Sequence, residues 1–153
     1  MNDLYDSDFV LWSERQAALL RRMGNRERVN DQVDWGNVAE EIESLGRNDR
    51  REIRSRLRVI CEHLLKWEFQ SAMRSNSWSS SIRKARDEIA DLIEESPSLA
   101  DYPATQLSGL KGAYVRGRRD AAAETGFTHL PQTCPWTIEQ VLDHGFWPEA
   151  LAP

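Results

Sequence analysis

The residues with the clearest capacity for chemistry lie on one predicted helix in the middle of the chain. Over residues 48–69 the apolar residues repeat at spacings of four and three, which predicts a long helix. A rotation of about 100° per residue places Arg56, His63 and Trp67 on one flank of its apolar stripe, whereas Arg58 points away. Histidine acts as a general acid or base, and arginine binds phosphate. This flank is therefore a candidate site for phosphodiester chemistry.

An arginine followed by a histidine on a bundle helix resembles the active-site motif of the HEPN ribonucleases. The resemblance implies metal-independent RNA cleavage, with His63 as general acid or base and Arg56 holding the phosphate. That family has a polar residue directly after the arginine, whereas Leu57 follows Arg56 here. Because 17 of the 20 basic residues are arginine, matches to so short a motif arise easily. The preferred interpretation is that His63 and Arg56 are structural, and the ribonuclease is the alternative.

A second candidate group is acidic and lies just before the long helix. On a helix predicted over residues 35–45, Glu41 flanks the apolar stripe. A carboxylate near a histidine on a neighbouring helix is an ingredient of metal sites in helical bundles. The supporting Glu-x-x-His pattern is missing, since Glu62 directly precedes His63. We therefore predict no metal site and no cofactor.

The same charges have a simpler interpretation as ion pairs. Five acidic residues lie between positions 31 and 43, and six arginines lie between positions 47 and 58. If Gly46 ends the first of the two helices, these blocks meet across a turn, and Glu41 pairs with Arg50 or Arg54. The arginines left over, which could bind phosphate, are Arg47, Arg51 and Arg58. Nucleic-acid binding is thus an alternative, which the net charge of -5 does not favour.

Tryptophan is the aromatic residue that offers the most surface for a partner. It is enriched at interface hot spots, so Trp67 and Trp78 are candidates for contact with a ligand or partner. Their inward positions on predicted helices nevertheless favour core packing. Trp136 and Trp147 lie in a proline-rich tail, where we expect them to anchor the tail to the helices or to contact another chain.

The elements that position these residues are all predicted to be helices. They cover residues 7–23, 35–45, 48–69, 77–96 and 105–125, followed by an irregular tail over about 127–153 with a short helix from Thr137. The inner face predicted for the last long helix comprises Leu107, Leu110, Tyr114, Gly117 and Ala121. We expect an all-α, up-and-down bundle of four to five helices, in one domain over residues 1–153.

Length and composition exclude several other classes of protein. The 153 residues are 40% hydrophobic, which suits one folded domain. No apolar run reaches the roughly 18 residues of a membrane span. The acidic start does not look like a signal peptide. Two cysteines, Cys61 and Cys134, suit a reducing compartment. We therefore expect a cytoplasmic protein that does not bind membranes.

Three stretches of the chain together resemble one bacterial family. They are YDSDFVLWSERQAALLR near the start, VDWGNVAEEIESLG with HLLKW in the middle, and TCPWTIEQVLDHGFWP near the end. In order and spacing they are similar to the family catalogued as domain of unknown function 29, from Tyr5 to Pro148. The resemblance implies an all-α bundle and carries no activity, substrate or cofactor. We predict a non-catalytic helical interaction module. Its partner is another protein or a second copy of the chain, and the residues do not identify which.

Overall fold

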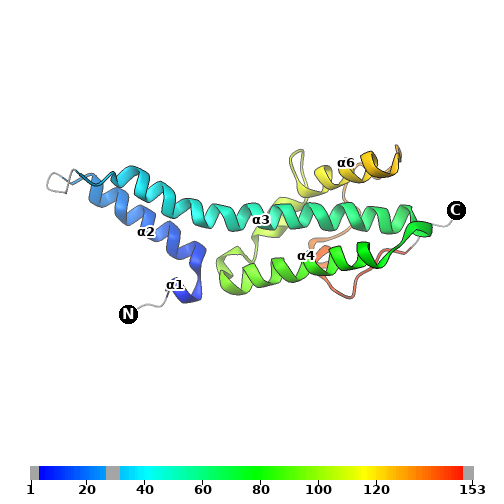
Figure 1. Cartoon of the computed structure of the whole chain (residues 1–153), viewed down its shortest axis with the longest axis horizontal. Coiled ribbons are helices and arrows are strands. Elements are labelled where there is room, and N and C mark those ends of the chain that lie inside the picture. The colour runs from blue at the N-terminus through cyan, green and yellow to red at the C-terminus, as the bar shows by residue number, and fades with distance from the viewer. Residues whose placement is uncertain (1–3, 27–31, 150–153) are drawn as a thin grey trace. The chain divides into compact units, whose positions relative to one another are not determined.

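The computed structural model describes residues 4–26 and 32–149, which form helices and no strand (Figure 1). The α-helices are α1 (Leu4–Ser7), α2 (Phe9–Gly24), α3 (Trp35–Phe69), α4 (Asn76–Glu95), α5 (Tyr102–Leu107), α6 (Ala113–Thr125) and α7 (Ile138–Leu142). The prediction of an all-α fold is confirmed. Asp31 in the predicted acidic block and residues 150–153 of the predicted tail lie outside the described residues.

Several helix ends follow the expected local chemistry. The short helix predicted from Thr137 is confirmed, since Thr137 and Gln140 form a reciprocal capping box at the start of α7. Gly126 ends α6 in the left-handed conformation, with φ of 77°. At the start of α2 the cap is Asp8, whose carboxylate accepts the backbone N–H of Leu11 at 2.9 Å.

The predicted break at Gly46 is wrong, and α3 runs without interruption through it. Gly46 is buried against α2, and a Cβ atom there would lie 2.7 Å from Ser13 Oγ and 3.3 Å from Val10 Cγ1. Glycine weakens a helix interior by about 1 kcal/mol, but here it permits close contact between two helices. The close packing against α2, and not the termination of a helix, explains why this residue is glycine.

The helix predicted over residues 105–125 is in fact two helices, α5 and α6. Between them Gly109 has a φ of 100°, which breaks the helix. Leu110, predicted to face inward, lies in this connection and is 96% exposed. The other residues predicted for the inner face are buried, namely Leu107, Tyr114, Gly117 and Ala121.

The chain divides into two compact units, of which the first comprises residues 1–51 and 92–100. Within it α2 lies antiparallel to the beginning of α3, with Gly24 beside Trp35 at one end. The 3-10 helix Pro97–Leu99 contacts the start of α2. There Asp8 accepts hydrogen bonds from the backbone N–H and the hydroxyl of Ser98, at 2.6 and 2.8 Å.

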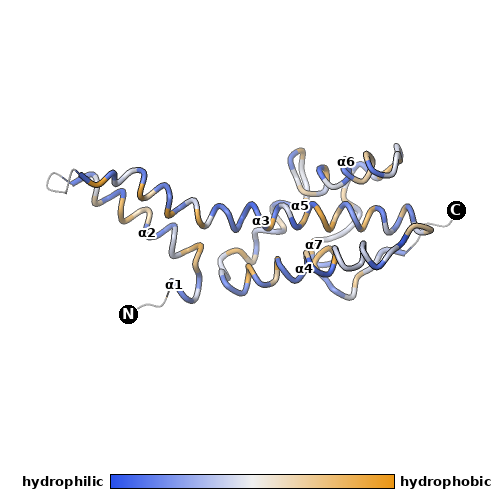
Figure 2. The backbone as a smooth tube through the Cα atoms, in the orientation of Figure 1, coloured by the Kyte–Doolittle hydropathy of each residue, from blue (hydrophilic) through white to orange (hydrophobic). Residues whose placement is uncertain are grey.

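The second unit comprises residues 52–91 and 101–153. Its core is an apolar stripe on α3, coloured orange in Figure 2, that meets buried residues of α4 and α6. The buried residues of this stripe are Ile53, Leu57, Ile60, Leu64 and Leu65. Gly117 of α6 contacts α3 at the Arg58 carbonyl. The single domain that the sequence predicts over both units stays a prediction.

Within the described ranges, the helices lack the apolar run that a membrane span requires.

Candidate interaction surface

His63 and Arg56 lie on the same helix but are held by different partners. The Nδ1 atom of His63 lies 2.9 Å from the Val59 carbonyl oxygen, one turn earlier, and the ring is half-buried. Arg56 forms ion pairs with Glu52 at 2.6 Å and with Glu88 of α4 at 2.5 Å. Two carboxylates therefore already neutralise the guanidinium that would have to bind phosphate. The geometry favours structural roles for both residues.

The ion pair predicted between Glu41 and Arg50 or Arg54 is not found among the described residues. Because α3 does not turn at Gly46, residues 41 and 50 lie along one straight helix instead of facing each other. Glu41 is exposed, and Arg50 instead pairs with Glu14 of α2 at 2.6 Å. Arg54 is also exposed.

The acidic residues next to Glu41 are the ones that make ion pairs. Arg21 of α2 lies 2.6 Å from Glu43 and 3.4 Å from Glu40. Arg47 also pairs with both carboxylates. The hydrogen bond from Arg21 lowers the pKa of Glu43. These four charged residues join one flank of α2 to α3. Arg58, also predicted to be free for phosphate binding, is paired with Asp120 of α6.

A buried lysine that the sequence analysis did not single out lies one turn after His63. Lys66 is 2% exposed, and its Nζ lies 2.7 Å from Glu124 of α6 and 3.4 Å from Glu62. The ammonium also lies 4.9 Å from the centre of the Trp78 ring. Burial raises the pKa of Glu62, and the hydrogen bond from Lys66 lowers the pKa of Glu124. Lys66 thus joins α3 to α6 through Glu124 and to α4 through the Trp78 ring.

Replacing His63 by glutamine is expected to reduce the loss of stability in acid. Burial lowers the pKa of His63 below 6.5, although the hydrogen bond to Val59 and the charge of Glu124 oppose this shift. The folded chain therefore binds this proton less readily than the unfolded chain. The stability due to neutral His63 is complete above about pH 6.5 and is lost as the pH falls toward the folded-state value.

Urea unfolding at about pH 7.5 and about pH 5.5 measures this effect, as the change in the free energy of unfolding between them. We expect a smaller change in His63→Gln than in the unaltered chain. His129→Gln, at an exposed position, is the matched control. An equal or larger change in His63→Gln would contradict the assignment.

The tryptophans of the tail anchor it to the helices, as predicted. The Trp147 ring lies 4.8 Å from the Trp67 ring, and Trp136 is 7% exposed and meets Tyr114 edge-on at 6.1 Å. Trp78, the other tryptophan predicted to be in the core, is half-buried. Aromatic contacts within the second unit therefore occupy the rings of Trp67, Trp136 and Trp147.

A second feature that sequence reasoning missed is Arg86, which is 2% exposed on α4. Its guanidinium donates to the backbone carbonyls of Val141 at 2.8 Å, Phe146 at 3.1 Å and Gln140 at 3.4 Å. Two of these carbonyls, those of Gln140 and Val141, lie in the last turn of α7, where helix carbonyls lack intrahelical partners, although Gln140 also accepts the Asp143 backbone N–H at 3.3 Å. Burial lowers the pKa of Arg86 to about 10. Arg86 thus caps α7 and holds the tail.

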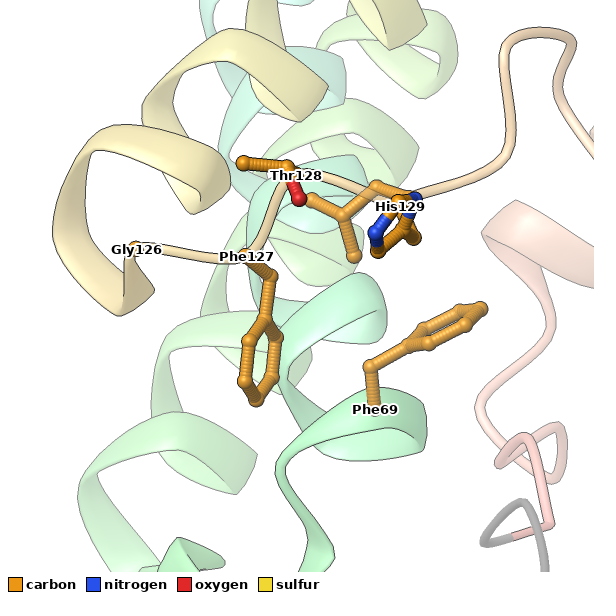
Figure 3. A pocket seen from close by; sticks show the side chains of 6 residues that line it. Phe69, Gly126, Phe127, Thr128 and His129 are labelled. Atoms are coloured by element: carbon orange, nitrogen blue, oxygen red, sulfur yellow. The ribbon is translucent and has the colours of Figure 1, made fainter.

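A pocket of about 300 Å³ lies beside the end of α3 (Figure 3). Its lining comprises Phe69, Gly126, Phe127, Thr128, His129 and Leu130. His129 is the one imidazole among these side chains, and neither His63 nor Arg56 lines the pocket. One histidine beside one threonine hydroxyl, with no acidic or further basic side chain in the lining, does not make a catalytic arrangement.

The first unit presents an apolar surface instead. On α2 one stripe of residues faces α3, and it contains buried Val10, Ser13 and Ala17. A second stripe lies about 100° around the helix, at spacings of four and three. Its apolar members are Trp12, Leu19 and Met23, of which Leu19 is 48% and Met23 42% exposed.

The beginning of α3 repeats this arrangement. Ala39 and Gly46 are buried, whereas Val38 is 39% and Leu45 44% exposed. On both helices the ion-paired residues lie on one side of the buried stripe and the exposed apolar residues lie on the other side. The exposed apolar residues of the two helices therefore share one flank. We call this flank the apolar flank; its exposed members are Leu19, Met23, Val38 and Leu45, and half-buried Trp12 and Ile42 lie beside them.

Together the fold and the surface define a class of protein, an all-α protein with an exposed apolar face on a helical hairpin. Among the described residues, no cluster of side chains suits a metal ion. The chain belongs to the family described as domain of unknown function DUF29, whose model matches residues 4–147. The resemblance noted in the sequence is confirmed.

A solved structure supports the same fold. The chain is similar to an alpha-helical protein of unknown function from Rhodospirillum rubrum, whose crystal structure was determined at 1.45 Å resolution. The two are 25% identical, the match covers 93% of this chain and 90% of the other, and the TM-score is 0.72. No curated protein matches the chain.

Proposed function

We propose that this protein is a non-catalytic interaction module, and that the apolar flank of α2 and α3 is its binding surface. One observation carries the proposal. Large apolar side chains gather on one flank of the hairpin, while the charges of the opposite flank are used in ion pairs. Exposed apolar faces of this kind mark sites of association. A single exposed leucine would need no such explanation.

The spacing of the apolar flank indicates the chemistry of its partner. Residues three and four apart on each helix form ridges, and the groove between two antiparallel helices accepts the ridges of a further helix. The surface therefore suits an amphipathic helical segment rather than an extended peptide. We also place the protein in the cytoplasm, where the unpaired Cys61 and Cys134 would stay reduced.

Site-specific photo-crosslinking in the host cell tests the proposal. A photoreactive amino acid at position 19 or 45 is expected to form a discrete adduct. The matched control places it at exposed position 18, on the ion-paired side of α2. The adduct from position 45 should disappear when Leu19→Asp is added. Adducts of equal yield at all three positions, or none at any, would contradict the proposal.

A further inference from the structure

We infer that the partner covering the apolar flank is a second copy of this chain, an inference that rests on the proposed function. The two-fold axis of this dimer runs parallel to α2 and α3. Helix α2 of each copy then lies antiparallel to α3 of the other copy. The four helices form an antiparallel bundle whose core is the two apolar flanks.

Charges at the two edges of the apolar flank support a second copy of the chain as the partner. Arg15 and Arg22 lie on α2 beyond its apolar stripe, and Glu41 lies on α3 beyond its own. All three side chains are exposed, and no ion pair engages them among the described residues. The α2 edge is therefore basic and the α3 edge is acidic. A surface with edges of opposite charge is complementary to a copy of itself.

The charges also select the direction of the symmetry axis. With the axis parallel to the helices, the basic edge of one copy meets the acidic edge of the other. With the axis perpendicular to them, α2 would face α2, and Arg15 and Arg22 would meet their own counterparts. Like charges facing each other disfavour that second arrangement.

The register of the hairpin places the opposite charges at the same level. Gly24 lies beside Trp35, and Gly46 lies beside Val10 and Ser13. This pairing puts Glu41 level with the part of α2 between residues 15 and 22. Rotation about a parallel axis keeps every residue at its level. Glu41 of one copy therefore comes between Arg15 and Arg22 of the other, within reach of both long side chains.

The size of the flank sets the expected strength of the dimer. Helix α2 has 16 residues and is about 24 Å long, and two helices side by side are about 20 Å wide. The surface buried is then about 500 Å² per copy, near the lower limit for a specific interface. We expect a reversible dimer with a Kd on the order of tens of micromolar.

Sedimentation equilibrium of the purified full chain tests this inference. The unaltered chain is expected to show a concentration-dependent equilibrium between monomer and dimer. Leu19→Asp should leave a monomer, and Glu41→Arg should weaken the dimer about tenfold, because attraction at both edges becomes repulsion. The matched control is Glu139→Arg, an equal change of charge at an exposed position of α7, which should leave the Kd unaltered. Circular dichroism of each variant in dilute solution confirms that it is folded.

A mixture of two variants supplies the sharpest result. Arg15→Glu with Arg22→Glu makes both edges acidic, whereas Glu41→Arg makes both edges basic. Each variant alone should associate weakly, and the two together should form a heterodimer at least as tight as the original dimer. The inference is overturned if the unaltered chain is monomeric up to about 1 mM, or if neither Leu19→Asp nor Glu41→Arg changes the Kd of the dimer.

The crosslinking experiment separates this inference from the proposed function. If the chain is monomeric but position 19 still yields a discrete adduct with a different protein, the second copy is the wrong partner and the binding surface stands. If the chain is monomeric and position 19 yields no adduct, both proposals fail.

Discussion

Replacing Arg86 by methionine is expected to lower the free energy of unfolding by about 3 to 4 kcal/mol. Methionine fills much of the same space and donates no hydrogen bond. The carbonyls of Val141 and Phe146 would then lose the Arg86 donor, and that of Gln140 would keep only the Asp143 backbone N–H at 3.3 Å. A buried polar group without a partner costs about 1 to 3 kcal/mol. Urea unfolding followed by circular dichroism measures the loss.

Two further variants separate the hydrogen bonds of Arg86 from its charge. Arg86→Lys keeps a cation but cannot reach three carbonyls from one planar group, so we expect most of the loss to remain. Arg83→Met is the matched control, since Arg83 is exposed on the same helix and also lies 5.4 Å from the Trp147 ring. Its effect should stay below about 1 kcal/mol. Equal losses for Arg83→Met and Arg86→Met would refute the capping role.

Replacing Gly117 by alanine is expected to destabilise the protein by about 2 to 3 kcal/mol. A Cβ atom at this position of α6 would lie 2.7 Å from the Arg58 carbonyl oxygen and 2.9 Å from the Glu62 backbone nitrogen. Both atoms belong to the backbone of α3, which cannot yield as a flexible side chain does. The two helices would have to move apart, and the core around them would lose contact. Thermal and urea unfolding report the change.

Gly36→Ala is the control for this substitution. Gly36 also lies in a helix, at the start of α3, and its Cβ would meet only Asp34 Oδ1 at 3.8 Å. Alanine there is expected to stabilise the protein by about 0.4 to 1 kcal/mol, through its higher helix propensity. The two glycines thus give changes of opposite sign. A stabilising effect at position 117 would show that α6 does not approach α3 as closely as described.

The apolar flank could not be predicted from the sequence. The spacing of Leu19 and Met23 was visible, but nothing local distinguished their stripe from the one that includes Val10 and Ala17. Only the position of α3 decides which stripe is covered. Similarly, Glu62 and Lys66 have the spacing of an ion pair on one helix. The third member of their cluster, Glu124, comes from a distant part of the chain.

The sequence by itself determined the helical class, the family, the end of α6 at Gly126 and the start of α7 at Thr137. These features depend on periodicity and on capping side chains, which act over a few residues. Tertiary structure alone decided that Gly46 lies within a continuous helix, because a close approach to α2 outweighs the local tendency of glycine to end helices. It also decided which carboxylate each arginine pairs with and that Arg86 is buried. Partners far apart in the chain are chosen by how helices pack, and no local pattern encodes that choice.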